Sequence, residues 1–118
     1  MNIEDIREYC LNKKSATESL PFDENTLVFK VKNKIFAILS LGISNLTLSL
    51  KGEPANNVEL REKYEFILPG YHMNKLHWNT IELRYNISAS LIKQLIDNSY
   101  NIVISTLPLR LKEELNKE

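Results

Sequence analysis

The most constraining feature of the sequence is a short segment in which leucine alternates with polar residues. Leucines occupy positions 46, 48 and 50, interleaved with Thr47, Ser49 and Lys51. Successive side chains of a β-strand point to opposite faces, so this alternation predicts a strand with one buried face. The chain is therefore expected to build a β-sheet against a hydrophobic core.

Three further segments have the composition of strands. Residues 26–32 and 34–41 are rich in β-branched and aromatic residues. The dipeptide Asn33-Lys34 is expected to form a tight hairpin turn between them, because asparagine tolerates a positive φ. Residues 77–84 form the third segment, whereas residues 15–26 are interpreted as a turn-rich loop.

Helical periodicity appears in four places. Asn2 is a suitable N-cap for the first helix, and Ser88 for the longest one. A helix that begins at Pro54 is expected to be short and amphipathic. The predicted helices cover residues 3–14, 54–64, 88–106 and 109–115. Because 118 residues suit one domain, the order of elements predicts a single α+β domain over residues 1–118, with an antiparallel sheet covered by helices.

The neutral net charge conceals a segregation of charged residues along the chain. Lysine plus arginine and aspartate plus glutamate number 15 each, so the chain has no overall field that would attract nucleic acid or an anionic membrane. Residues 27–52 nevertheless carry four lysines, residues 66–81 carry one, and neither segment contains an acidic residue. A local site for anions on one face or edge of the sheet is therefore a reasonable hypothesis.

Several classes of protein are disfavoured by what the sequence lacks. Its single cysteine, Cys10, has no disulfide partner in the chain, and the N-terminus does not resemble a signal peptide, so we expect a cytoplasmic protein. No apolar run is long enough for a membrane span. Three isolated glycines make no phosphate-binding loop, and Cys10, His72 and His77 are too sparse for a zinc site. We expect no cofactor and no metal, and Cys10 is interpreted as a buried hydrophobe.

Two features of the basic segments are candidates for function, and each has a structural alternative. Lys30 and Lys32 are expected to share one strand face, with Lys34 in the adjoining turn, although lysines also protect exposed sheet edges. Strand alternation places Trp78 on the polar side of its strand, where an exposed indole could stack on a base. A local bulge or a covering loop could instead bury it, which we favour. His77 could likewise be purely structural.

Seven segments together resemble a family of small bacterial proteins. They are Leu20-Pro21-Phe22-Asp23, Leu27-Val28-Phe29-Lys30-Val31, Lys34-Ile35-Phe36-Ala37, Leu48-Ser49-Leu50-Lys51, Pro69-Gly70-Tyr71-His72-Met73-Asn74-Lys75, His77-Trp78-Asn79-Thr80 and Ser99-Tyr100. This pattern resembles the MmcQ/YjbR family, and residues 72–80 are its most specific part. The resemblance implies a frataxin-like (CyaY-like) α+β fold and a DNA-binding role. It implies no catalytic residues, and frataxin's iron binding does not carry over, because the first helix has few acidic residues.

We therefore expect a non-catalytic, DNA-binding protein, monomeric, whose binding is weak and salt-sensitive. Its expected contact residues are Lys30, Lys32, Lys34, Lys51, His72, Asn74, Lys75, His77 and Trp78. The alternative is a domain that binds a protein partner or a small anion, with a pocket lined by residues 72–80. An enzyme is not expected, because no nucleophile or carboxylate partner accompanies His72, Lys75 and His77.

Overall fold

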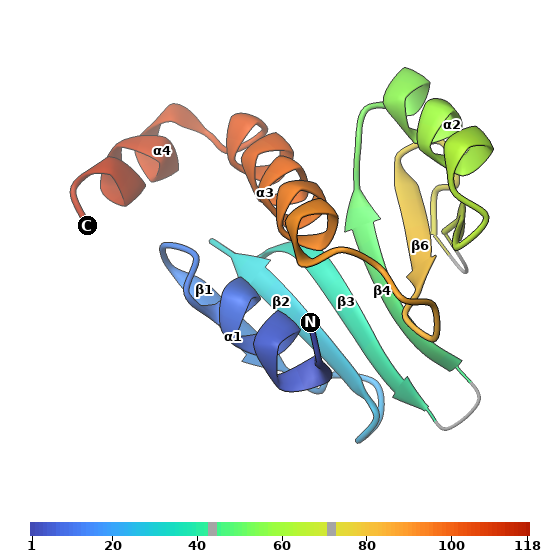
Figure 1. Ribbon diagram of the computed structural model, residues 1–118. Coiled ribbons are helices and arrows are strands. Elements are labelled where there is room, and N and C mark those ends of the chain that lie inside the picture. Colours follow the sequence, from blue (N-terminus) through green and yellow to red (C-terminus); the bar gives the residue numbers. More distant parts are fainter. Residues whose placement is uncertain (43–44, 71–72) are drawn as a thin grey trace.

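The computed structural model describes residues 1–42, 45–70 and 73–118 (Figure 1). Within these residues the helices are α1 (Ile3–Leu11), α2 (Pro54–Lys63), α3 (Ala89–Ser105) and α4 (Leu109–Asn116). The strands are β1 (Ala16–Ser19), β2 (Thr26–Val31), β3 (Lys34–Gly42), β4 (Asn45–Lys51), β5 (Ile67–Pro69) and β6 (Trp78–Glu82). The predicted α+β class with an antiparallel sheet is confirmed.

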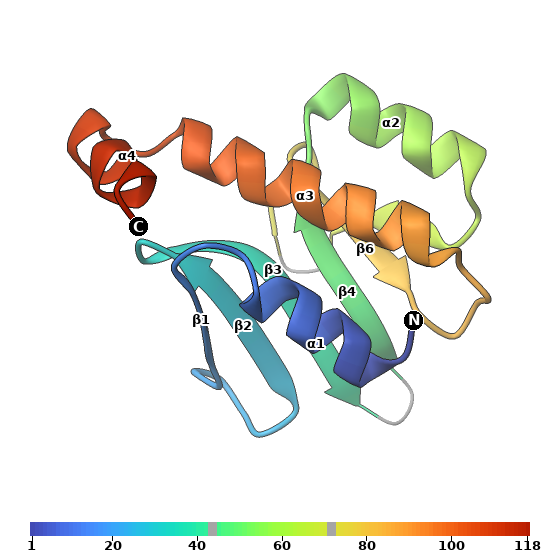
Figure 2. The ribbon, with the colours of Figure 1, turned by 60° about the vertical axis from the view of Figure 1, so that its left-hand side comes forward.

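All six strands pair antiparallel, in the order β1-β2-β3-β4-β6-β5. Helices α1 and α3 lie across the same face of the sheet (Figure 2). Side chains of that face form the core with the helices; among them are Phe29, Val31, Phe36, Leu39, Leu48, Leu50 and Ile81. Within the described residues the opposite face of the sheet carries no helix, and we call it the open face.

The four predicted helices are all present, and both predicted N-caps are formed. The Asn2 side chain accepts from the Asp5 N–H at 2.8 Å, and the Asp5 carboxylate accepts from the Asn2 N–H at 3.2 Å, which completes a capping box. The Ser88 hydroxyl accepts a hydrogen bond from the third residue of α3. Helix α3 continues through residues 102–104, as its 3.6-residue period predicts.

The prediction that α2 is amphipathic is wrong. Its one buried residue within the helix is Asn57, which is 2% exposed, whereas Val58 is 41% exposed. The buried carboxamide is fully hydrogen-bonded, with its Nδ2 donating to the carbonyls of Gly52 and Leu76 at 3.1 and 3.2 Å. Polar interactions with neighbouring loops therefore replace much of the apolar packing expected of a surface helix.

Strands β1 and β5 have no residue range in the sequence prediction. Strand β1 lies in the segment interpreted as a loop, and it lacks apolar alternation because it forms the edge of the sheet beside β2. Arg7 of α1 donates to Glu18 of β1 at 2.8 Å through Nε, so this short strand is also fixed by a charged pair. Strand β5 has three residues and ends in Pro69, on the other edge, where a proline is tolerated.

The expectation that β4 has only one buried face is also wrong. Thr47 and Ser49 point away from the leucines yet are 8% and 5% exposed. The Ser49 and Thr80 hydroxyls form a hydrogen bond of 3.0 Å across β4 and β6. These residues lie at the floor of a groove on the open face, which explains why polar residues of an alternating strand are buried.

The hairpin turn between β2 and β3 is displaced by one residue from its predicted position. Lys32 and Asn33 have φ values of 48° and 68°, so these two residues, and not Asn33-Lys34, form the turn. The expectation that Lys32 shares a strand face with Lys30 is therefore wrong. Its Nζ lies 3.3 Å from a carboxylate oxygen of Glu118 and 3.7 Å from one of Glu114.

A β-bulge in β3 is fixed by a serine of helix α3. The β2–β3 register pairs Phe29 with Ala37 but Lys30 with Ile35, so Phe36 is the extra residue. The buried Ser99 hydroxyl donates to the Phe36 carbonyl at 2.6 Å and accepts from the Lys51 N–H at 2.9 Å. One side chain thereby satisfies two backbone groups at neighbouring strand ends.

Replacing Ser99 with alanine is expected to destabilise the domain by about 2–4 kcal/mol, because both backbone groups lose their partner in a buried position. Urea unfolding of the Ser99→Ala variant measures this change in the free energy of unfolding. Ser90→Ala, at an exposed position of the same helix, is the control. A loss no larger than that of the control would contradict the role assigned to Ser99.

Asp97 joins α3 to α1 through two partners. Its carboxylate accepts from the Tyr9 hydroxyl at 2.7 Å and forms an ion pair with Lys13. Burial opposes its charge, but the hydrogen bonds from Lys13 and Tyr9 prevail, so the pKa of the Asp97 carboxyl is lowered. A lowered folded-state pKa contributes stability that is present above the unfolded pKa, about 3.9, and is lost as the pH falls through the folded value.

Asp97→Asn is therefore expected to lower the free energy of unfolding at neutral pH, and its difference from the wild type should shrink below about pH 4. Urea unfolding at neutral and acidic pH measures both values. Glu59→Gln, on the exposed surface of α2, should show no such pH-dependent difference. An Asp97→Asn effect that stays constant with pH would refute the ion-pair explanation.

Candidate functional site

The two acid-free segments of the sequence meet in the sheet. Residues 27–52 contain most of β2 and all of β3 and β4, while residues 66–81 contain β5 and most of β6. Strand β4 pairs with β6, so the two segments are neighbours, and this pairing places Lys51 opposite Trp78. The two acid-free segments are therefore adjacent in one sheet.

The end of the sheet beside the C-terminal end of α3 gathers several of the predicted contact residues. Lys34, Lys51 and Trp78 line one hollow there, together with Asn33, Ile35, Val103 and Thr106. Lys30 pairs with Ile35 in the β2–β3 register and lies on the same face. Two lysines and an indole therefore border one depression, with a third lysine beside it.

A groove of about 570 Å³ continues from this end along the open face. Phe22 and Asp23 line it on one side, and Met73, Asn74 and Trp78 on the other. Its floor consists of strand residues: Thr26, Ile35, Ile38, Ser40, Thr47, Ser49 and Thr80. Two segments about fifty residues apart in the sequence, one containing residues 22–23 and the other residues 73, 74 and 78, therefore border one cavity.

Trp78 is held in this position by close backbone packing. It is half-buried and lies on the same side of β6 as Thr80, as strand alternation predicts. The Gly70 N–H donates to the Trp78 carbonyl at 2.9 Å. A Cβ atom added to Gly70 would lie 2.8 Å from the Trp78 Cβ, so only glycine allows this approach.

Asn74 shapes the loop that precedes Trp78. Its Oδ1 accepts from the Leu76 N–H at 2.9 Å, and its carbonyl accepts from the N–H groups of His77 and Trp78 at 3.2 and 3.0 Å. The loop is therefore a compact turn with Asn74 as its organising residue. Asn74 also lines the groove, so its position is compatible with both a structural and a contact role.

The remaining predicted residues are more dispersed. Lys32 is paired with acidic residues of the C-terminal segment, and Lys75 is exposed on the loop without lining the groove. His77 is half-buried, and its carbonyl accepts from the Gly52 N–H at 2.9 Å. His72 lies outside the described residues. The predicted set thus separates into a gathered group of Lys30, Lys34, Lys51, Asn74 and Trp78, and scattered others.

Sequence reasoning missed the apolar side chains of the groove. Phe22 is 71% exposed, an unusual position for a large aromatic residue. The signal available in the sequence was a phenylalanine within a polar turn that contains proline and aspartate. Met73 and Ile38 offered no comparable signal, because their placement depends on how the strands pair.

The described residues contain neither a candidate metal centre nor an exposed thiol. Among them no group of three or more histidine, cysteine, aspartate or glutamate residues could hold a metal ion. Cys10 is fully buried, and burial raises the pKa of its thiol to about 12, so it is a core residue as predicted. No helix in the described part of the chain is long and apolar enough to cross a membrane.

The sequence model of the YjbR family matches residues 11–102, which include the groove and the gathered lysines. The chain belongs to the YjbR family. It is 32% identical to YjbR of Escherichia coli strain K12 over 108 residues, or 92% of each chain. It is 37% identical to YbdF of Escherichia coli O157:H7 over 90 residues, or 76% of this chain and 74% of that protein.

Solved structures agree with the fold of this YjbR-family chain. A crystal structure of a Deinococcus radiodurans protein with domain DUF419 superimposes with a TM-score of 0.90 at 36% identity, covering 98% of this chain and 88% of that one. A crystal structure of a Pseudomonas syringae protein gives a TM-score of 0.73 at 29% identity, covering 86% of this chain and 98% of that one. The resemblance in sequence is therefore accompanied by the same overall architecture.

Gly70→Ala is expected to displace Trp78, because the added Cβ meets the Trp78 Cβ at 2.8 Å and its carbonyl oxygen at 3.1 Å. The chain has one tryptophan, so its fluorescence reports on this site alone. We expect a shifted emission maximum and a lower free energy of unfolding. The reciprocal change Ala55→Gly, on exposed α2, should leave the emission unchanged. An unaltered spectrum in Gly70→Ala would contradict the proposed packing.

Proposed function

We propose that this YjbR-family protein is a non-catalytic nucleic-acid-binding domain that holds a short single-stranded segment of DNA against its open face. The observation that carries the proposal is the hollow bordered by Lys34, Lys51 and Trp78. Lysines beside an aromatic ring are the components of single-strand binding sites, in which ammonium groups contact phosphates and bases stack on rings. Lys30 extends the basic group along the same face.

Single-stranded DNA fits this surface better than a duplex does. Trp78 is half-buried in a concave surface, and the bases of a duplex are already stacked on each other. An unpaired base could enter the groove and stack on the indole, with hydroxyls such as those of Ser40 and Thr47 near its edges. Because few phosphates are contacted, we expect binding to be weak and to fall with salt.

The test is fluorescence anisotropy of a labelled oligothymidylate at several salt concentrations. With three phosphates neutralised, log affinity should fall against log salt with a slope of about −2. The double variant Lys34→Glu/Lys51→Glu should bind at least about tenfold more weakly at about 50 mM salt. Lys32→Ala should have little effect, because that lysine is paired with Glu114 and Glu118.

Arg110→Glu/Lys117→Glu, at two exposed positions near the C-terminus, is the matched control, because it changes the net charge by the same amount as the double variant. The proposal fails if no binding is detected at about 25 mM salt, or if the control weakens binding as much as the double variant does. Preference for duplex over single strand would also contradict it.

A segment of another protein is the second candidate for the groove. The exposed Phe22 and the apolar residues Ile38 and Met73 favour this candidate, since a groove lined by apolar side chains together with hydroxyl groups suits an extended peptide. Binding of a peptide should depend on Phe22 and Trp78 and be nearly independent of salt. The salt series above therefore distinguishes the two candidates.

Two finer expectations stay part of this proposal. A frataxin-like arrangement is supported by α1 and α3 backing one face of an antiparallel sheet. A cytoplasmic location is supported by the single buried thiol of Cys10, which suits a reducing compartment.

A further inference from the structure

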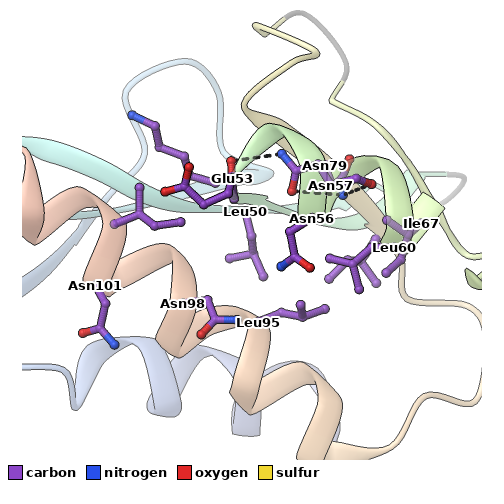
Figure 3. A pocket seen from close by; sticks show the side chains of 14 residues that line it. Leu50, Glu53, Asn56, Asn57, Leu60, Ile67, Asn79, Leu95, Asn98 and Asn101 are labelled. Carbon is purple, nitrogen blue, oxygen red and sulfur yellow. Dashed lines mark hydrogen bonds between the residues drawn. The ribbon is translucent and has the colours of Figure 1, made fainter. Parts of the chain in front are cut away.

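A second cavity lies on the helix-covered side of the sheet, between α2 and α3, and Figure 3 shows it from close by. It encloses about 280 Å³. Its apolar lining residues are Leu50, Leu60, Ile67, Ile81, Leu95 and Ile102, and five asparagines accompany them: Asn56, Asn57, Asn79, Asn98 and Asn101. We call it the carboxamide pocket.

Two of these asparagines are buried and fully engaged within the protein. Arg61 can only donate hydrogen bonds, and its Nη1 lies 2.8 Å from the Asn79 Oδ1, which fixes the orientation of that carboxamide. The Asn79 Nδ2 then donates to the carbonyl and Oδ1 of Asn57, both at 3.3 Å. The Asn57 Nδ2 in turn donates to two backbone carbonyls. This pair therefore has no donor left for a ligand.

The other three asparagines are available. Asn56 on α2 and Asn98 and Asn101 on α3 are exposed, and their side chains make no hydrogen bond within the described residues. Asn56 and Asn98 face the same hollow from opposite sides (Figure 3). Each carboxamide presents donors and an acceptor side by side, so the rim offers paired donor and acceptor groups above an apolar interior.

We propose that the carboxamide pocket binds a small, neutral heterocycle with an adjacent hydrogen-bond donor and acceptor, such as a nucleobase or nucleoside. An asparagine carboxamide pairs with the donor and acceptor edge of adenine in two parallel hydrogen bonds, while an apolar interior accommodates the ring. The cavity is at the small end of ligand sites, so it suits a molecule of this size and not a dinucleotide.

The charges near the pocket favour a neutral ligand. Lys51 and Glu53 both line it, and their charges oppose each other. A phosphate group that approached Lys51 would also approach the Glu53 carboxylate, so it should gain little. Lys51 lines both this pocket and the hollow of the proposed function, but the inference does not depend on that function, because Asn56, Asn98 and Asn101 line only the carboxamide pocket.

The test is a titration of the full chain with adenosine and uridine, followed by two-dimensional NMR of asparagine side-chain amides and backbone amides. We expect saturable shifts of Asn56 and Asn98, with dissociation constants in the millimolar range or tighter for at least one nucleoside, at concentrations up to about 5 mM. Asn98→Leu and Asn56→Ala should each weaken that binding at least about fivefold, through loss of a paired contact. Gln94→Leu, exposed on the same helix and outside the pocket, is the matched control.

A titration with adenosine monophosphate is the second measurement. Its dissociation constant should lie within about twofold of that of adenosine, because the charges of Lys51 and Glu53 offset each other. Much tighter binding of the monophosphate would overturn the assignment of a neutral ligand. The proposal also fails if neither nucleoside produces saturable shifts, if the pocket variants bind like the wild type, or if only the Trp78 indole responds. The oligonucleotide titration uses other variants, so either idea can fail without the other.

Discussion

The hydroxyl of Ser99 is the contact on which the arrangement of both faces depends. It donates to the carbonyl of Phe36 and accepts from the N–H of Lys51, two backbone groups that have no partner in the strand ladders at that point. The bulge at Phe36 sends that ring into the core, where it packs edge-on against Tyr100 with centroids 5.3 Å apart, while Ile35 faces the opposite side. Helix α3 thereby fixes the ends of β3 and β4. The positions of Lys34 and Lys51 beside Trp78 follow from this local geometry.

The sequence predicts those elements whose stability comes from their own periodicity. Four strands, four helices and two N-caps follow from alternation, from the 3.6-residue repeat and from capping residues. Strand β1 does not follow, because Ala16–Ser19 has no apolar pattern and exists as an edge beside β2. The burial of Thr47 and Ser49 does not follow either, since it depends on loops distant in the sequence that border the groove above them. Local pattern predicts an element's type, but not what covers its second face.

The candidate site was predictable in composition and only partly in geometry. The acid-free segments can be identified directly in the sequence, but the β4–β6 pairing that joins them cannot, because α2 and β5 separate these two strands along the chain. The ion pairs of Lys32 could not be predicted from the sequence. They result from a turn shifted by one residue and from glutamates more than eighty positions away. Charge along the sequence therefore indicated which strands carry the lysines, whereas which of those lysines lie together depends on the backbone conformation at a single turn.

Helix α2, on the helix-covered side of the sheet, supports the loop that presents Trp78 on the open face. The helix buries a carboxamide instead of an apolar stripe, and that carboxamide donates to the carbonyls of Gly52, directly after β4, and Leu76, shortly before β6. Arg61, one turn further along, donates to Asn79 and reaches the Lys75 carbonyl at 3.5 Å. The loop that presents Trp78 on the open face is thus held from behind by α2. A polar helix is what this position requires, because a loop exposes carbonyls, and only hydrogen-bond donors can satisfy them where water is excluded.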